Sequence, residues 1–318
     1  MAAPVMLPFA VQPDLAATMD IQIPALAWQR REGETWGRMY LTEDSATEVT
    51  VTEDDHALRF VPCRALGASA HRQLARRLRS HFPRQVASLG LGARPVLAAL
   101  ADRYQGVIVM HADPFEALIL TVLSQNRTGE IVRRVYPVLE NRCGGTTPGR
   151  IAALDERELR EIIRPAGPYK APRLAAVRTI AADGPGRFAR TVTGAPGEQA
   201  MAYLTSLPGV AHKTAACVLV FAAQSDHTLP VDTHLFRVAR RLGLASHDGT
   251  LTAATRDAIV SALLGYGPDL APAHFLFLLL GRTTCTAGSP RCGDCFLEPG
   301  CPAVGVAPAS SGAQGRPW

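Results

Sequence analysis

The chain has 318 residues, of which 47% are hydrophobic and 19% charged, a balance that excludes a disordered protein and is typical of a globular one. No apolar run reaches the length of about 18 residues that crosses a bilayer, and no basic residue precedes the first apolar stretch, so we expect neither membrane insertion nor export. Residues 1–60 carry four arginines and ten acidic residues, a charge of −6, which leaves +11 for the remainder of a chain whose total is +5. The basic remainder fits a polyanionic partner such as nucleic acid and fits ordinary solubility charge equally well.

The N-terminal region predicts a small sheet. Between residues 20 and 62 the stretches LAWQR, TWGRMYL, TEVTVT and ALRFV are separated by turn-forming residues and predict three or four antiparallel strands. The next stretch, HRQLARRLRSHF, has helical spacing and four arginines. Its arginines fit a solvated helix face as well as a DNA contact.

A buried helix is predicted to begin at Asp113. An aspartate in the capping position, a proline at the first helical position and Glu116 in the first turn are all helix-start signals. The helix continues through EALILTVL, which is apolar on nearly all sides, and ends in the polar stretch SQNRT at residues 124–128. Such an end suits a pocket mouth or an inserting loop, although simple helix termination is the default for an isolated segment.

Most of the remaining chain is predicted to be helical. The expected helices lie near residues 129–142, 155–163, 170–182, 197–206, 212–223, 233–243, 252–263 and 272–281. The stretch AVGVAPASSGAQGRPW after Cys301 predicts a disordered tail, because it consists mainly of small residues and prolines.

The stretch LPGVAHKTA at residues 207–215 contains Lys213, one of only two lysines in the sequence. Pro208 keeps Leu207 out of the helical region, and Gly209 permits a tight turn before a helix that begins near His212. The stretch therefore predicts a helix-hairpin-helix, whose free amide groups form a natural phosphate site. A purely structural hairpin satisfies the same pattern.

Four of the seven cysteines lie together in CTAGSPRCGDCFLEPGC, at Cys285, Cys292, Cys295 and Cys301. An odd number of cysteines in a chain not expected to be exported argues against a disulfide framework, and four thiols within 17 residues indicate a metal. Structural zinc usually takes two Cys-x2-Cys type pairs, whereas this loop has one such pair. A cubane iron-sulfur cluster also takes four thiolates from a compact segment, so the spacing leaves both metals open.

The stretch VDTHLFRVARRLGL predicts a helix capped by Asp232. Its buried stripe is expected to consist of Leu235, Val238, Ala239 and Leu242. The outward-facing residues are expected to be Arg237, Arg240 and Arg241.

Three ordered motifs, LPGVAHKTA, VDTHLFRVARRLGL and the GRTTC that heads the cysteine loop, closely resemble the endonuclease III family of DNA glycosylases. The stretches DPFEALILTVLSQNRT and GPYKAPRL resemble that family's upstream helices, so the resemblance covers roughly residues 110–302. It implies a mostly α helix-hairpin-helix DNA glycosylase fold whose C-terminal loop holds a [4Fe-4S] cluster on the four clustered cysteines. The small antiparallel β-rich N-terminal domain resembles that of the 8-oxoguanine and alkyladenine glycosylases instead.

The resemblance also implies the chemistry. Lys213 takes the position of the nucleophile, and Asp232 that of the aspartate that stabilises the developing sugar cation and assists proton transfer. An imine with the sugar C1′ requires a neutral primary amine, which a guanidinium does not supply. Gln125 or Asn126 is expected to fill the gap left by an extruded base. The other expected DNA contacts are Arg127, Leu207, Gly209, Val210, Ala211, His212 and Thr214.

The sequence therefore predicts four regions: a β domain at 1–66, a helical domain at 67–125 and 233–302 closed by the cluster loop, a helical barrel at 126–232 that carries the hairpin, and a disordered tail at 303–318. The expected partner is double-stranded DNA with a damaged base or an abasic site, bound by a monomer in the cytoplasm at the nucleoid. The expected reaction is removal of an oxidised pyrimidine followed by β-elimination through a Lys213 imine.

Two alternatives stay open. One is a monofunctional glycosylase for a mismatched or oxidised purine base. The other is a catalytically weak DNA-binding damage sensor, which is favoured by two departures from the family pattern. Ala211 replaces the second hairpin glycine, and Gly129 stands where the family commonly has aspartate.

Overall fold

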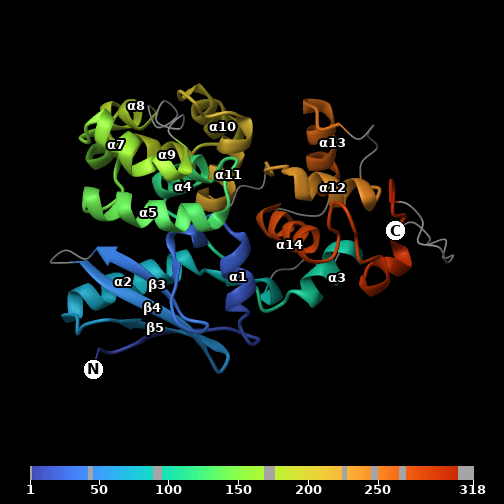
Figure 1. The fold of residues 1–318 in the computed structure, drawn as a ribbon, viewed down its shortest axis with the longest axis horizontal. Coiled ribbons are helices and arrows are strands. Elements are labelled where there is room, and N and C mark those ends of the chain that lie inside the picture. The colour runs from blue at the N-terminus through green and yellow to red at the C-terminus, as the bar shows by residue number, and fades with distance from the viewer. Residues whose placement is uncertain are drawn as a thin grey trace. The chain divides into compact units, whose positions relative to one another are not determined.

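The structure, a computed structural model, describes residues 2–41, 46–88, 95–167, 176–223, 228–244, 250–264 and 270–306. The chain forms two compact units, of which the first comprises Met1–Gln85 and Gly106–Ala223 and the second Val86–Gln105 and Gln224–Trp318 (Figure 1). This division differs from the predicted one, because residues 67–85 and 106–125 belong to the first unit and not with the cysteine loop. Within the described ranges, no helix is both long enough and apolar enough to cross a membrane.

The first unit contains a five-stranded antiparallel sheet in the order β1-β5-β4-β3-β2. Its strands are β1 (Val5–Pro8), β2 (Gln29–Arg30), β3 (Trp36–Leu41), β4 (Ala46–Asp54) and β5 (Ala57–Pro62). Buried and less buried residues alternate along β4, as expected for a sheet with one face on a core. The predicted small antiparallel sheet is confirmed, and β1, which pairs with β5, was not predicted.

The stretch LAWQR differs from its prediction as a strand. Its first residues lie in a 3-10 turn, η1 (Pro24–Ala27), and only Gln29 and Arg30 pair with β3. Pro24 explains the difference, because its ring fixes φ in a range that suits a helical turn. An unpredicted helix, α1 (Leu15–Ile21), precedes it, capped by Asp14, whose side chain accepts a hydrogen bond from the Ala17 amide at 2.8 Å.

Helices make up most of the rest of the first unit. They are α2 (Ala68–His81), α4 (Pro114–Ser124), α5 (Gly129–Cys143), α6 (Pro148–Ala152), α7 (Glu156–Ile163), α8 (Ala176–Ala182), α9 (Pro185–Gly194), α10 (Gly197–Ser206) and α11 (His212–Ala223). The turn η3 (Arg164–Ala166) follows α7, and β6 (Arg84–Gln85) pairs with β7 (Ile108–Val109). Of the helix predicted at 170–182, the part before Ala176 lies outside the described residues.

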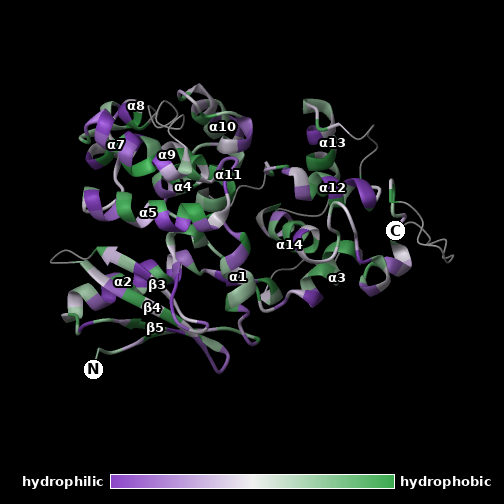
Figure 2. Cartoon of the chain, in the orientation of Figure 1, coloured by the Kyte–Doolittle hydropathy of each residue, from purple (hydrophilic) through white to green (hydrophobic). Residues whose placement is uncertain are grey.

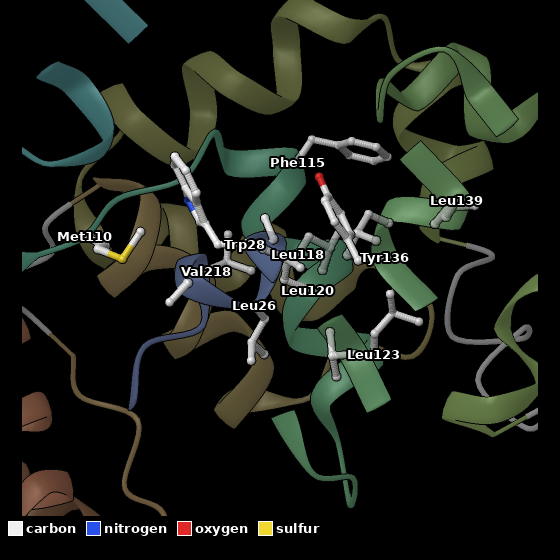
Figure 3. Packing of buried hydrophobic residues seen from close by; sticks show 14 of the residues in the cluster. Leu26, Trp28, Met110, Phe115, Leu118, Leu120, Leu123, Tyr136, Leu139 and Val218 are labelled. Carbon is white, nitrogen blue, oxygen red and sulfur yellow. The ribbon is translucent and has the colours of Figure 1, made fainter. Parts of the chain in front are cut away.

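The core of the first unit forms around α4, ten of whose eleven residues are buried. Figure 3 shows Leu118, Leu120 and Leu123 of α4 gathered with Tyr136 of α5 and Val218 of α11. The residues of α4 are mostly hydrophobic, whereas those of α7, in Figure 2, are mostly hydrophilic. The burial of α4, which is apolar on nearly all sides, confirms the prediction of a buried helix.

One buried ion cluster joins the sheet to the helices. Arg38 of β3 lies 2.7 Å from the Glu116 carboxylate of α4 and 3.5 Å from the Glu140 carboxylate of α5, and all three side chains are almost fully buried. Burial raises the pKa of Glu140, Glu116 raises it further, and Arg38 opposes the shift. A buried charge needs such partners, so the cluster fixes where α4 and α5 meet the sheet.

The second unit is built on α14 (Leu270–Thr283), which packs against α12 (Thr233–Arg241), α13 (Ala253–Leu264) and α3 (Pro95–Arg103). Its described residues also include the short turns η2 (Val86–Ser88), η6 (Cys292–Asp294) and η7 (Glu298–Gly300). Where a disordered tail was predicted from residue 303, the Val304 amide donates to the Arg241 carbonyl at 3.1 Å and residues 303–306 form a turn. Residues 307–318 of the predicted tail lie outside the described residues.

Two buried histidines generate a testable pH dependence. Burial, with Arg84 adding to it, lowers the pKa of His111 to about 4, and burial also lowers the pKa of His81. Both rings are therefore neutral when folded and take up protons when unfolded, so stability is lost as pH falls below about 6.5, and the loss from His111 is complete near pH 4. For His111 the loss amounts to about 3 kcal/mol.

Urea unfolding at pH 7 and pH 4.5 measures this loss. The His111→Gln variant should lose about 2–3 kcal/mol less than the wild type between the two conditions, since it has no ring to protonate. An equal loss in both proteins would contradict the assignment.

Candidate active site

The predicted helix-hairpin-helix is present between α10 and α11. The backbone leaves the helical conformation at Leu207, with φ −75° and ψ 139°. Gly209 adopts φ +76°, a value that residues with a side chain rarely adopt. The Val210 amide donates to the Leu207 carbonyl at 3.1 Å and closes the turn. Helix α11 then begins at His212, the predicted position.

The hairpin presents amide groups and few side chains. Leu207 and Val210 are buried, at 4% and 5% exposure, so their side chains are not presented to a ligand. The amides of Gly209 and Ala211 donate to no acceptor among the described residues. Together with the amides in the first turn of α11, they form a cluster of donors at the positive end of a helix dipole. Such a cluster suits phosphate.

Lys213 is the second residue of α11 and is exposed. Its neighbour Thr214 is buried, and the Thr214 Oγ1 accepts a hydrogen bond from the Gln125 Nε2 at 2.8 Å. The predicted DNA contacts Gln125 and Thr214, which lie 89 residues apart in the sequence, are thus in direct contact.

The segment between α4 and α5 has an unusual backbone. Asn126 adopts a left-handed φ of +55° and is exposed, whereas Gln125 is half-buried. Arg127 donates from Nε to the Ala166 carbonyl at 3.0 Å and from Nη1 to the Asn126 carbonyl at 3.1 Å. Two nitrogens of the Arg127 guanidinium therefore donate hydrogen bonds to main-chain carbonyls of the protein.

Asp232 lies in the second unit, as the N-cap of α12. Its Oδ1 accepts a hydrogen bond from the Leu235 amide at 2.8 Å, which confirms the predicted cap. Its Oδ2 bonds to no other residue of the described ranges, and the side chain is half-buried. One carboxylate oxygen therefore caps the helix, and the other has no partner among the described residues.

The four clustered cysteines lie in the loop after α14. All are half-buried and none forms a disulfide. Burial raises the pKa of Cys295 and of Cys301, and the charges of Cys285 and Cys292 add to both shifts, so the four sulfurs lie near one another.

This donor set fits a [4Fe-4S] cluster. In a cubane each thiolate binds a different iron, so the sulfurs remain farther apart than the ligands of a single zinc ion. No group of three or more His, Cys, Asp or Glu side chains in the described ranges is placed to hold one metal ion. Four thiols in one short loop are the donors that a cluster would take.

Arg237 and Arg241 do not face outward as predicted. Arg241 is buried and donates to the Cys285 sulfur at 3.3 Å and to the carbonyls of Thr286 at 2.6 Å and Ala287 at 3.1 Å. Arg237 donates to the Cys285 carbonyl at 2.9 Å. A guanidinium has five donors and suits several carbonyls at once, so both side chains turn toward the loop. Their spacing of four residues, which places both on one helix face, was the signal that prediction overlooked.

Three comparisons extend these observations. Residues 119–259 match the HhH-GPD superfamily of base excision DNA repair proteins. The chain is 32% identical over 229 residues to endonuclease III of Synechocystis, across 71% of this chain and 98% of that protein. It is 38% identical over 189 residues to endonuclease III of Treponema pallidum, across 59% and 82%. The apo structure of Clostridium acetobutylicum 8-oxoguanine glycosylase/lyase has a TM-score of 0.69 at 17% identity, across 88% of this chain and 97% of that one.

The hairpin, the capping aspartate and the cysteine loop, in this order on this fold, define a base excision repair DNA glycosylase. With 32% identity across 98% of a relative, the chain belongs to the endonuclease III family of the HhH-GPD superfamily. The likeness in fold to the Clostridium enzyme reaches further, because 88% of the chain includes part of the region before residue 110.

Proposed function

We propose that the chain removes a damaged base and then cleaves the abasic site that it creates, with Lys213 as the nucleophile. The observation that carries the proposal is the position of Lys213, an exposed lysine in the first turn of the hairpin's second helix. The sequence has only one other lysine. The Lys213 side chain forms no hydrogen bond or ion pair with another residue of the described ranges, so its amine is available to a bound sugar.

The chemistry requires a primary amine. The Lys213 Nζ attacks the sugar C1′, and the bond from C1′ to the base breaks with its electrons leaving on the base. Opening of the sugar ring and loss of a proton from nitrogen give the imine. Removal of a proton from C2′ then expels the 3′ phosphate by β-elimination, and water releases the lysine. A guanidinium neither loses its proton readily nor forms this intermediate.

Asp232 is proposed to stabilise the positive charge that develops at C1′ as the base leaves. A carboxylate aimed at developing charge lowers the barrier of the glycosylic step. Because its Oδ1 is held by the Leu235 amide, the carboxylate has a fixed direction before substrate binds. The proposal also assigns the open amides at Gly209 and Ala211 to phosphates of the DNA backbone.

Oxidised pyrimidine is the proposed base, and the resemblance to the endonuclease III family supports it. A specific observation supports a second candidate, an oxidised purine. The fold likeness to an 8-oxoguanine glycosylase/lyase includes part of the N-terminal region. Leu26, which belongs to η1 in this N-terminal region, lies against Gly129: a Cβ at residue 129 would be 3.0 Å from the Leu26 Cδ2. Leu26 therefore occupies the space that a side chain at residue 129 would take. A panel of duplexes that each contain one lesion distinguishes the two bases.

The four clustered cysteines are proposed to hold a [4Fe-4S] cluster. When bound, the cluster would supply a rigid core to a loop that has few apolar residues of its own. The residues of this chain that prepare the site are Arg237 and Arg241, which hold the backbone at Cys285–Ala287. No step of the proposed base excision uses the cluster.

Replacement of Lys213 tests the nucleophile. The Lys213→Arg variant keeps the charge, so if the lysine only stabilises charge, strand cleavage at an abasic site should fall by no more than about tenfold. We expect cleavage and borohydride trapping of a protein–DNA adduct to vanish while duplex binding stays near wild type. Lys170→Arg is the control, and an adduct that survives in Lys213→Arg but disappears in Lys170→Arg would assign the reaction to the other lysine.

Replacement of Asp232 separates its two roles. Asparagine is also a good N-cap, so Asp232→Asn should unfold at nearly the wild-type temperature, whereas Asp232→Ala should lose about 1 kcal/mol of stability. Both variants should lose base excision by about 100-fold or more and retain more of the cleavage at a preformed abasic site. Equal loss of the two activities in Asp232→Asn would contradict the assignment to the glycosylic step.

Replacement of Arg241 tests the metal loop. Protein purified without oxygen should contain about four irons. In Arg241→Lys the ammonium does not reach the same set of carbonyls, so affinity for the cluster should fall by about 10–100-fold, measured as iron content and visible absorbance after dilution with a chelator. Arg240→Lys is the matched control, since Arg240 makes no hydrogen bond to the cysteine loop within the described residues. Wild-type protein with one zinc ion and no iron would exclude the cluster.

A further inference from the structure

The link between α4 and α5 is four residues long, from 125 to 128, and has a backbone that needs support. Gln125 is the C-cap of α4, Asn126 adopts φ +55°, and Thr128 is the N-cap of α5. Asparagine tolerates the left-handed region better than most residues, yet the conformation remains less favourable than an ordinary turn. Something must therefore hold the segment in this form.

Side chains on both sides of Asn126 provide that support. On one side, the Gln125 Nε2 donates to the Thr214 Oγ1 at 2.8 Å, which fastens the segment to α11. On the other, the Arg127 Nε donates to the Ala166 carbonyl at 3.0 Å, which fastens it to the end of η3. The Arg127 amide also donates to the Ser124 carbonyl at 3.2 Å. The segment is thus tied to two separate elements of the first unit.

Gln125, Asn126 and Arg127 differ in burial and in the hydrogen bonds of their side chains. Gln125 is half-buried, whereas Asn126 and Arg127 are both exposed. The Arg127 guanidinium is bonded to main-chain oxygens. Gln125 and Asn126 were both candidates to fill the gap that an extruded base leaves. The contacts favour Asn126 for that role, because filling the gap with Gln125 would break its bond to Thr214.

We propose that Gln125, Thr214 and Arg127 are positioning residues that hold Asn126 in the form that enters the DNA stack, before DNA binds. The inference rests on the proposed function and adds to it the residues that prepare the segment. A preformed segment avoids the entropy of ordering a loop during binding, so it raises affinity for DNA with a vacated base position and leaves affinity for intact duplex unchanged. Because Thr214 follows Lys213, the same bond fixes the segment relative to the nucleophile's helix.

The test compares variants on two duplexes that differ only in one stable abasic analogue. Thr214→Val removes the acceptor at nearly constant shape, Thr214→Ser keeps the hydroxyl, and Gln125→Met removes the donor. Thr205→Val is the matched control, since the Thr205 hydroxyl bonds within its own helix, to the Met201 carbonyl at 2.9 Å. Binding constants for both duplexes are measured, with a fluorescent adenine analogue opposite the abasic position to report the state of the orphan base.

Thr214→Val and Gln125→Met should each lower affinity for the abasic duplex, relative to the intact duplex, by about fivefold, the effect of one lost hydrogen bond. Arg127→Met should lower the same ratio, because it removes both bonds of the guanidinium, and its lost charge should weaken binding to both duplexes alike. Thr214→Ser and Thr205→Val should bind like the wild type. The double variant Gln125→Met with Thr214→Val should lose no more than either single variant, because both remove the same bond.

Two results would overturn the proposal, and they differ in whether the proposed function also fails. If Asn126→Ala loses selectivity for the abasic duplex while the positioning variants keep it, Asn126 does not depend on the hydrogen bonds of Gln125, Thr214 and Arg127. The positioning role is then wrong, and the proposed function stands. If the wild type shows no selectivity for the abasic duplex and no borohydride-trapped adduct, the proposed function fails and the inference fails with it. Thermal unfolding of each variant shows whether a loss of affinity reflects folding, and Thr214→Ser repeats the test at the same buried position.

Discussion

The antiparallel packing of α4 against α11 is the constraint on which the first unit depends. The Ala112 amide donates to the Phe221 carbonyl at one end of the pair, and Gln125 donates to Thr214 at the other. Since α4 is buried on almost every side, it cannot shift along α11 without opening the core. The end of α4 sets where Asn126 emerges, and the start of α11 sets the position of Lys213. Both candidate positions therefore follow from one buried helix pair.

The N-terminal region is attached to α4 and α5 by charged groups as well as by apolar contacts. Arg38 reaches Glu116 and Glu140, while Arg133 of α5 donates to the Ala25 and Trp28 carbonyls and lies 4.6 Å from the centre of the Trp36 ring. A buried ion pair adds little net stability but penalises any arrangement that leaves a charge unpaired. The sheet is thus held in one position against α4 and α5. The absence of a side chain at Gly129 belongs to the same arrangement, because Leu26 comes close there.

Features with local causes were predictable from the sequence, and features made by distant contacts were not. Pro208 and Gly209 define the hairpin through their own backbone limits, and Asp113 and Asp232 cap helices that begin beside them, so these elements lie where they were predicted. The bond from Gln125 depends on a residue 89 positions away, which no local pattern reveals. Arg241 was expected at the surface because arginine usually lies there, whereas its donors match carbonyls of a loop 44 to 46 residues downstream.

Helix α12 connects the capping aspartate to the cysteine loop within one short element. Asp232 fixes the first turn through the Leu235 amide, and Arg237 and Arg241, one turn apart, fix the loop beside Cys285. A helix of nine residues is only marginally stable in isolation. The contacts at each end of α12 therefore help to keep it formed. The loop carbonyls supply those contacts for the last turns of α12. Order in the cysteine loop and the direction of the Asp232 carboxylate therefore depend on the same helix, although no cysteine lies near Asp232 in the sequence.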